Sequence, residues 1–179
     1  MKWNRIAVLV ITLVVAPQAQ AEGPFAGISL GLVSSEEADT ENLGFVAGHS
    51  EDDGFGFEVF YLKALSDDSA TVSGISGDIS TDTWGILGVY KTANDIYFEN
   101  VYFKGKVGIG VITIEADADG GGSIDDSAAD FAIGFAVGTT LGPGDLELSY
   151  TMLPSAGEFD DIGIDADADI IAINYLWYL

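Results

Sequence analysis

Cysteine is absent from this 179-residue sequence, and basic residues are scarce. Without cysteine the chain can form no disulfide and can carry out no thiol chemistry. Six lysine and arginine residues stand against 29 acidic residues, so the formal net charge is −23. A negative charge of this size disfavours binding to nucleic acid or to an anionic surface.

The sequence also has no long apolar run, apart from a short one near its start. Lys2 and Arg5 precede the apolar residues 6–15, and the small-residue site 19–21 follows. A basic start, a short apolar run and small residues are typical of a secretory signal peptide. We therefore expect residues 1–21 to be a signal peptide that is removed from the mature protein.

The mature chain is expected to comprise residues 22–179, with four lysines against 29 acids and a formal charge of −25. None of its apolar runs approaches the roughly 20 residues of a membrane-spanning helix. If the exported chain stays in a membrane, it must therefore cross it as a closed β-barrel, because lipid offers no partners to unpaired backbone groups.

What the sequence does contain is alternation, clearest between Phe131 and Met152. Large apolar residues alternate with small or polar ones on both sides of a Gly-Pro-Gly-Asp turn at 142–145. This period of two predicts a β-hairpin. Its second face is mostly glycine, alanine, serine and threonine, which suits the cramped interior of a narrow barrel better than the solvated face of a soluble sheet.

The same period predicts eight strands in all. They are expected at 25–33, 43–49, 55–63, 83–90, within 96–114, at 131–140, 146–152 and 171–179. In 83–90 the pattern does not assign the two faces, because Trp84, Ile86, Leu87 and Val89 are all apolar. Aromatic residues near strand ends suit membrane-interface girdles. They are Trp84, Tyr90, Tyr97, Phe98, Tyr150, Trp177 and Tyr178.

Connections between the expected strands alternate between long and short. The long, acidic ones are 34–42, 66–81, 115–130 and 154–167, and the short ones are 50–54, 92–95 and 142–145. Outer-membrane barrels have this layout, with long outer loops and short periplasmic turns. The prediction is an all-β fold, a monomeric eight-stranded antiparallel up-and-down transmembrane β-barrel over residues 22–179, with four acidic extracellular loops and both termini in the periplasm.

The opening segment 24–31, Pro-Phe-Ala-Gly-Ile-Ser-Leu-Gly, and the alternating final segment 171–179 resemble the small OmpA-like outer-membrane β-barrel family, also called porin-family proteins. The resemblance covers the mature chain and rests on pattern. It implies location in the outer membrane of a Gram-negative cell, contact with lipid and lipopolysaccharide, and insertion by the barrel-assembly machinery. That machinery recognises a C-terminal strand commonly ending in an aromatic residue, whereas this chain ends in Leu179.

Four charged residues are predicted to meet inside the barrel. The alternation places Lys104 and Lys106 on the inward face, together with Glu58 and Glu147. A buried charge without a partner is costly. We therefore predict a network of these four side chains that plugs the lumen, the alternative being that one or both lysines lie at a rim in water.

A weak metal-binding pattern occurs in the third acidic connection. The positions of Asp117, Asp119 and Asp125 resemble those in an EF-hand loop, but Gly121 and Ala128 stand where two oxygen ligands are expected. A hydrated acidic loop is the plainer interpretation, and adaptation to a saline habitat explains the same composition. No cofactor is expected beyond loosely bound Ca²⁺ or Mg²⁺.

The predicted function is a structural or surface-interaction role, because eight strands enclose little more than their own side chains. A narrow channel or a conduit for a hydrophobic ligand is the alternative. A lipid A-modifying enzyme is less favoured, since hydrolysis or acyl transfer needs a nucleophile with a histidine base, and the single histidine, His49, is expected beside a periplasmic turn. A soluble secreted β-sandwich is a further alternative.

Overall fold

The computed structural model describes residues 23–35, 39–72, 75–92, 100–118, 123–153, 158–159, 164–165 and 167–179. The predicted signal peptide and the expected girdle residues Tyr97 and Phe98 lie outside these ranges. Within them, no helix has the length and apolar character needed to cross a bilayer.

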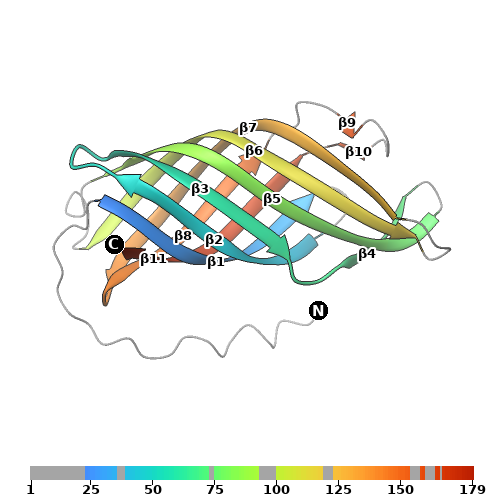
Figure 1. Cartoon of the computed structure of the whole chain (residues 1–179), viewed down its shortest axis with the longest axis horizontal. Helices are drawn as coiled ribbons and strands as arrows, with labels where there is room; N and C mark the ends of the chain where they lie inside the picture. The colour runs from blue at the N-terminus through green and yellow to red at the C-terminus, as the bar shows by residue number, and fades with distance from the viewer. Residues whose placement is uncertain are drawn as a thin grey trace.

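Eight long strands form one closed antiparallel barrel (Figure 1). They are β1 (Gly23–Ser35), β2 (Asp39–Ser50), β3 (Phe55–Ala64), β5 (Ile75–Lys91), β6 (Val101–Ala118), β7 (Ser123–Leu141), β8 (Gly144–Leu153) and β11 (Ala168–Tyr178). Each strand pairs with the next along the chain, β11 pairs with β1, and the pairing of β3 with β5 continues the ring. The predicted eight-stranded up-and-down barrel is confirmed, and a two-layer sandwich is excluded.

Three further strands are short: β4 (Asp68–Val72), β9 (Glu158–Phe159) and β10 (Ile164–Asp165). β4 pairs with the first residues of β5, and β9 pairs with β10 in a separate two-stranded sheet.

Side chains alternate between the outside and the lumen as the period predicts. In β7 and β11, Phe131, Ile133, Ile171 and Ile173 are exposed, whereas the residues between them turn inward. The structure also settles the faces of β5, which the pattern left open. Trp84, Ile86 and Tyr90 point outward, and Leu87 and Val89 are buried in the lumen. The barrel therefore presents an apolar outer wall, as a lipid-facing barrel requires.

Aromatic side chains mark both ends of this wall. Tyr61 and Tyr150 direct their hydroxyls to Asp82 (3.2 Å) and Asp169 (2.8 Å) at one end. At the other end the rings of Phe55 and Tyr90 lie 5.0 Å apart, and those of Tyr175 and Trp177 lie 4.8 Å apart. The girdle prediction is wrong for Tyr178, which turns into the barrel mouth and bonds to Asp145.

Several predicted loops are strands instead. Pairing between β5 and β6 continues to Gly77 and Ala118, and pairing between β6 and β7 continues to Asp117 and Ser123. Predicted loop 115–130 is therefore largely a β-hairpin. Most of 66–81 belongs to β4 and β5, and predicted loop 34–42 is largely the ends of β1 and β2. The acid-rich composition suggested solvated loops, but inward residues such as Ile114 keep the period, so the backbone stays paired beyond the barrel wall.

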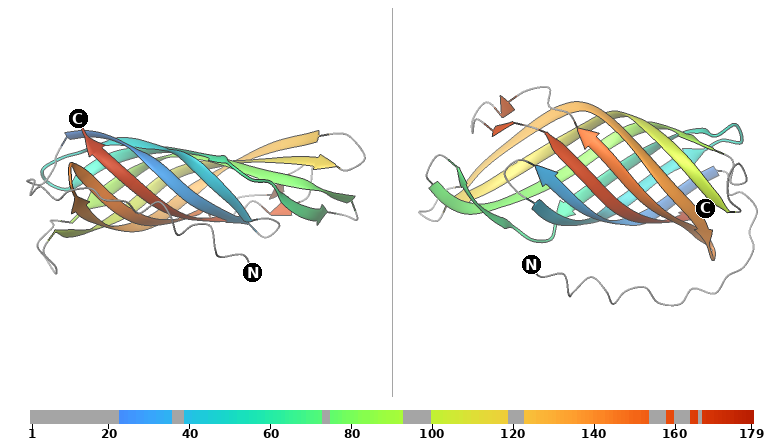
Figure 2. Two further views of the ribbon diagram at one scale, coloured as in Figure 1. Left: turned by 90° about the horizontal axis from the view of Figure 1, so that it is seen from below. Right: turned by 180° about the vertical axis from the view of Figure 1, so that it is seen from behind.

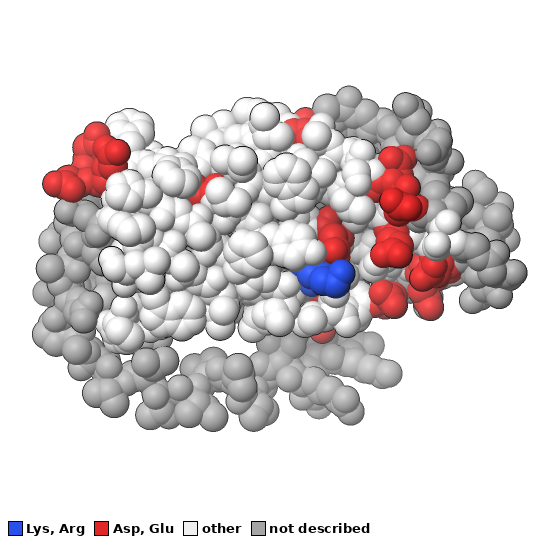
Figure 3. All heavy atoms as spheres, in the orientation of Figure 1, with Lys and Arg blue, Asp and Glu red and all other residues white. Residues whose placement is uncertain are grey.

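As a result, β4 to β7 project beyond the ends of the other barrel strands (Figure 2). The end of the barrel that carries this projection is called the projecting end below. The opposite end carries the turns between β2 and β3 and between β7 and β8, together with the C-terminus. Figure 3 shows acidic side chains at both ends of the barrel, more of them at the projecting end, and an almost uncharged wall in the middle.

The sequence suggested a polar lumen, but the structure shows that the lumen is polar in only part of its length. Its half nearer the projecting end holds six branched aliphatic side chains, here called the apolar layer: Val33, Leu62, Ile112, Ile114, Leu153 and Ile170. The uncharged polar side chains of Thr40, Asn42, Thr81 and Thr83 are buried at the same level. Its half nearer the C-terminus holds six charged side chains, here called the charged layer: Glu58, Lys91, Lys104, Lys106, Asp145 and Glu147. The lumen is thus divided along the barrel axis into two chemically different parts.

Candidate functional site

The charged layer is built around the four residues that the sequence placed in the lumen. Glu58 extends from β3, Glu147 from β8, and both lysines from β6. Lys104 Nζ lies 3.1 Å from Glu58 Oε2 and 2.5 Å from Glu147 Oε2. Lys106 Nζ lies 2.7 Å from Glu58 Oε1 and 3.0 Å from Glu147 Oε1. Each lysine therefore bridges both glutamates, and the four charges alternate in sign around a square.

This square connects opposite parts of the barrel wall, because β3, β6 and β8 are not neighbours in the sheet. None of the four residues is more than 4% exposed. Burying charges costs several kcal/mol for each ion unless partners and hydrogen bonds compensate. Here every carboxylate oxygen of Glu58 and Glu147 lies within 3.1 Å of an ammonium group.

Polar neighbours surround Glu147. The Tyr102 hydroxyl donates to its Oε2 at 3.3 Å, and Asn174 Nδ2 donates to its Oε1 at 3.2 Å. The same Asn174 amide lies 3.2 Å from Ser149 Oγ. These bonds fix the direction of the carboxylate, so the ion square has one well-defined arrangement.

A further ion pair, which the sequence did not reveal, closes the mouth near the C-terminus. Lys91 Nζ lies 3.1 Å from Asp145 Oδ2 and donates to the Tyr178 hydroxyl at 3.0 Å. Tyr178 in turn donates to Asp145 at 2.8 Å. The Lys91 ammonium also lies 4.0 Å from the centre of the Tyr102 ring, within range of a cation–π contact.

This pair was missed because each member stands at the end of a strand. Lys91 is the last residue of β5, and Asp145 follows the turn before β8. The sequence pattern indicates a strand that ends at residue 90 and a turn at 142–145, so it places neither side chain in the lumen. The available signal was parity, since Lys91 lies two residues from inward-facing Val89.

The charged layer is electrically neutral as a result. Three lysines, Lys91, Lys104 and Lys106, face three acids, Glu58, Asp145 and Glu147. The remaining lysine of the described residues, Lys63, is exposed at the projecting end and lies 3.4 Å from Asp82. The large negative charge of the chain is therefore carried outside the charged layer.

A glycine makes room for one member of the charged layer. Gly138 of β7 lies beneath the ring of Tyr102, and a Cβ atom at that position would overlap the ring. The absence of a side chain at Gly138 lets Tyr102 reach Glu147. Inward glycines in this barrel therefore serve packing as well as strand curvature.

Little space remains inside. A cavity of about 20 Å³ lies between the two layers, lined among others by Lys106, Leu62 and Ile170. Such a volume holds about one water molecule. Among the described residues, side chains of the two layers fill most of the lumen.

The single histidine lies near the barrel mouth at the C-terminal end. His49 pairs with Pro24, whose carbonyl oxygen accepts a hydrogen bond from the Leu179 amide at 3.0 Å. The His49 ring is stacked on that of Phe57, with 6.5 Å between ring centres. This agrees with the predicted position beside the turn between β2 and β3.

Two residues of the weak metal pattern lie in paired strands. Asp117 belongs to β6 opposite Ser123, and Asp125 belongs to β7 opposite Glu115. Asp119 lies outside the described residues. In the part of the chain that the structure describes, no three acidic or histidine side chains are arranged to hold a metal ion. Loose binding of Ca²⁺ or Mg²⁺ stays a prediction.

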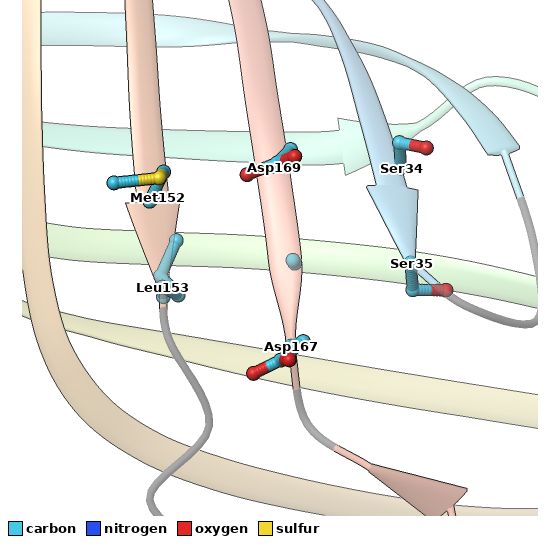
Figure 4. A pocket seen from close by; sticks show the side chains of 7 residues that line it. Ser34, Ser35, Met152, Leu153, Asp167 and Asp169 are labelled. Carbon is cyan, nitrogen blue, oxygen red and sulfur yellow. The ribbon is translucent and has the colours of Figure 1, made fainter.

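A hollow of about 340 Å³ lies at the projecting end, where β8, β11 and β1 terminate (Figure 4). Its lining combines two exposed aspartates, Asp167 and Asp169, with the serines Ser34 and Ser35 and with Met152. Asp169 already accepts the Tyr150 hydroxyl, and Ser34 donates to Asp39 at 2.5 Å. The hollow is therefore a rim between strand ends with its polar groups largely engaged.

No protein-family model and no curated protein matches the sequence. Solved structures do match. Neisserial surface protein A aligns with a TM-score of 0.61 at 15% identity, over 90% of this chain and 100% of that chain. The N-terminal β-barrel domain of Pseudomonas aeruginosa OprF gives 0.55 at 9% identity, over 88% and 100%.

Ail, the attachment invasion locus protein of Yersinia pestis, solved with the heparin analogue sucrose octasulfate, gives a TM-score of 0.51 at 14% identity, over 87% of this chain and 97% of that chain. At these identities the likeness concerns the fold. The chain has the fold of small eight-stranded outer-membrane β-barrels, as the resemblance in its sequence indicated.

Proposed function

We propose that this chain is an integral outer-membrane protein whose closed barrel serves as a structural platform for an acidic surface outside the cell. The observation that carries the proposal is the distribution of side chains, which is the reverse of that in water-soluble proteins. Bulky apolar side chains cover the outer wall, and paired charges fill the centre. An exposed apolar wall of this extent is stable against lipid and unfavourable in water.

The direction of insertion follows from the two ends of the barrel. The turn Glu51–Gly54 and the turn at Gly142 and Pro143 are short, and they lie at the end that carries the C-terminus. The projecting end carries the longer β5–β6–β7 extension. Outer-membrane barrels direct short turns to the periplasm, so the projecting end lies outside the cell and both termini lie in the periplasm.

The proposed partners follow from this placement. The wall contacts outer-membrane lipid, and the projecting end lies at the level of lipopolysaccharide, where loosely bound divalent cations would relieve repulsion between acids and phosphates. The barrel acts as a monomer, inserted by the barrel-assembly machinery, and binds no nucleic acid. The structural similarity to outer-membrane barrels supports the membrane placement through the fold.

A channel is the second candidate, and the filled lumen argues against it. Planar-bilayer recording of the refolded, heat-modifiable protein decides between the two. We expect a silent bilayer. Discrete, stable conductance steps from the parent protein would contradict the structural role and favour a conduit.

We infer further that His49 has no catalytic role. It lies at the end assigned to the periplasm, away from outer-leaflet lipid, and Ser50 beside it is buried. Lipopolysaccharide incubated with the barrel should keep all its acyl chains. Deacylation that disappears in His49→Ala would overturn this inference.

A further inference from the structure

The side chains of the apolar layer extend across the lumen and pack together, so they do not line an open passage. None of its six side chains is more than 4% exposed. Leu62 of β3 reaches past β2, so that its Cδ1 would lie 3.3 Å from a Cβ at Gly31 of β1. Leu153 of β8 reaches past β7 and fills the space above Gly110 of β6. Each leucine therefore spans an intervening strand.

The two layers lie on opposite sides of a small cavity. The cavity of about 20 Å³ lies between them, with Glu58 and Lys106 on its charged side and Leu62 and Ile170 on its apolar side. Removing charge from one side of this cavity leaves the aliphatic packing on the other side in place. Thr81 and Thr83 are buried beside Ile114 and Ile112 on the neighbouring strand, so this half is not purely apolar. Its aliphatic side chains are nevertheless closely packed, and a tight hydrophobic constriction bars ions.

We propose that the apolar layer is a second seal of the lumen, which keeps the barrel closed to ions even when the charged layer is neutralised. The inference rests on the proposed membrane role, since a seal has meaning only in a protein that crosses a bilayer. It assigns closure of the half nearer the projecting end to Leu62, Leu153 and their aliphatic neighbours.

The first test uses the absence of native cysteine. Ser29 is buried and lines the cavity between the layers, so Ser29→Cys places a thiol there. The reagent is a small water-soluble methanethiosulfonate, and the protein is held in lipid nanodiscs. Exposed Ser66, changed to cysteine, is the matched positive control.

We expect no labelling of Ser29→Cys during the time in which Ser66→Cys reacts completely. Adding Leu62→Ser and Leu153→Ser should make Ser29→Cys reactive although the charged layer is intact. Labelling of Ser29→Cys in the parent background, or no gain from the two leucine changes, would overturn the proposal.

The second test measures conductance. A variant with Glu58, Lys104, Lys106 and Glu147 all changed to glutamine should remain silent in a planar bilayer. The same variant with Leu62→Ser and Leu153→Ser should show conductance steps. If the glutamine variant does not refold, the double change Glu58→Gln and Lys106→Gln replaces it, because it removes one charge of each sign and leaves Lys104 paired with Glu147.

Conductance by the charge-neutralised variant alone would overturn the second seal. That result differs from a conducting parent protein, which would instead contradict the proposed structural function. Silence of the variant with both layers altered would also count against the proposal, since it would show that other residues close the lumen.

Discussion

At the residue scale, the stability of the charged layer depends on complete pairing. Lys106 contacts both Glu58 and Glu147 at 3.0 Å or less, and Lys104 contacts the same two carboxylates. Two lysines are needed to balance two glutamates, so the loss of one leaves an uncompensated buried negative charge.

Lys106→Met should therefore lower the free energy of unfolding by about 3–5 kcal/mol, the range for breaking a buried ion pair. The measurement is urea unfolding of the refolded barrel in lipid bilayers, followed by its heat-modifiable migration. Lys63→Met is the matched control, because the Lys63 side chain is 68% exposed. An exposed pair contributes about 0–1 kcal/mol, so this control should change little. Equal stability of Lys106→Met and the parent would show that the ion square does not hold the barrel together.

Gly138 faces the lumen and Gly105 faces outward, so alanine substitutions at these two positions can be compared for their effect on stability. Gly138→Ala would push a methyl group into the Tyr102 ring, and overpacking of this kind costs about 1–3 kcal/mol. Gly105→Ala points outward and meets nothing within 4 Å, so it should stay within about 0.5 kcal/mol of the parent. The same unfolding assay compares them. A Gly138→Ala barrel as stable as Gly105→Ala would refute the packing role of Gly138.

At the scale of elements, the hairpin of β6 and β7 carries acids directly opposite one another. Glu115 faces Asp125, and Asp117 of the same strand faces Asp78 of β5. All four side chains are exposed, and like charges directly opposite each other destabilise a sheet. This end of the barrel should therefore open locally before the membrane-spanning part does.

Glu115→Lys should stabilise the hairpin by about 0.2–1 kcal/mol, since it replaces a repulsive cross-strand pair with an attractive one. Amide hydrogen exchange of residues 113–117 and 123–127 provides the measurement, with slower exchange expected. Glu115→Gln is the control and should give a smaller gain. Unchanged or faster exchange in Glu115→Lys would mean that the repulsion is already relieved in the parent.

At the scale of the whole molecule, the neutral charged layer inside the barrel and the many exposed acids outside it should respond differently to salt. Screening acts on exposed charges, with a Debye length of about 10 Å at 0.1 M and about 3 Å at 1 M, and acts much less on buried pairs. The lumenal pairs should therefore be insensitive to salt, while the projecting end gains stability from it.

Thermal unfolding should accordingly shift to higher temperature as NaCl is raised from low concentration, and the midpoint should then level off.

Comparing CaCl₂ and NaCl at matched ionic strength tests the predicted loose cation binding. A larger shift with CaCl₂, together with heat in isothermal calorimetry, would indicate divalent-cation sites. Equal shifts would leave general screening, and thus a saline adaptation, as the explanation. A shift to lower temperature with added salt would contradict the charge distribution described above.

Much of the architecture was predictable because a barrel strand has a period of two that every residue obeys. The outward positions of Phe131 and Ile171 and the inward positions of Lys104 and Glu58 follow from parity alone. The loop predictions failed at Glu115 and Asp125, because acidic composition was given more weight than the alternation that continues through them.

The sequence by itself determined which side chains face lipid and which face the lumen, since neighbouring residues of one strand must point to opposite sides. The need of buried charges for partners also predicted that Glu58, Lys104, Lys106 and Glu147 meet, but only the tertiary structure decided the other contacts between inward side chains. Contacts such as Lys91 with Asp145 and Tyr178, or Leu62 above Gly31, join strands that are not neighbours in the sheet. These contacts depend on the tilt and stagger with which the sheet closes, and no local pattern along one strand contains that information.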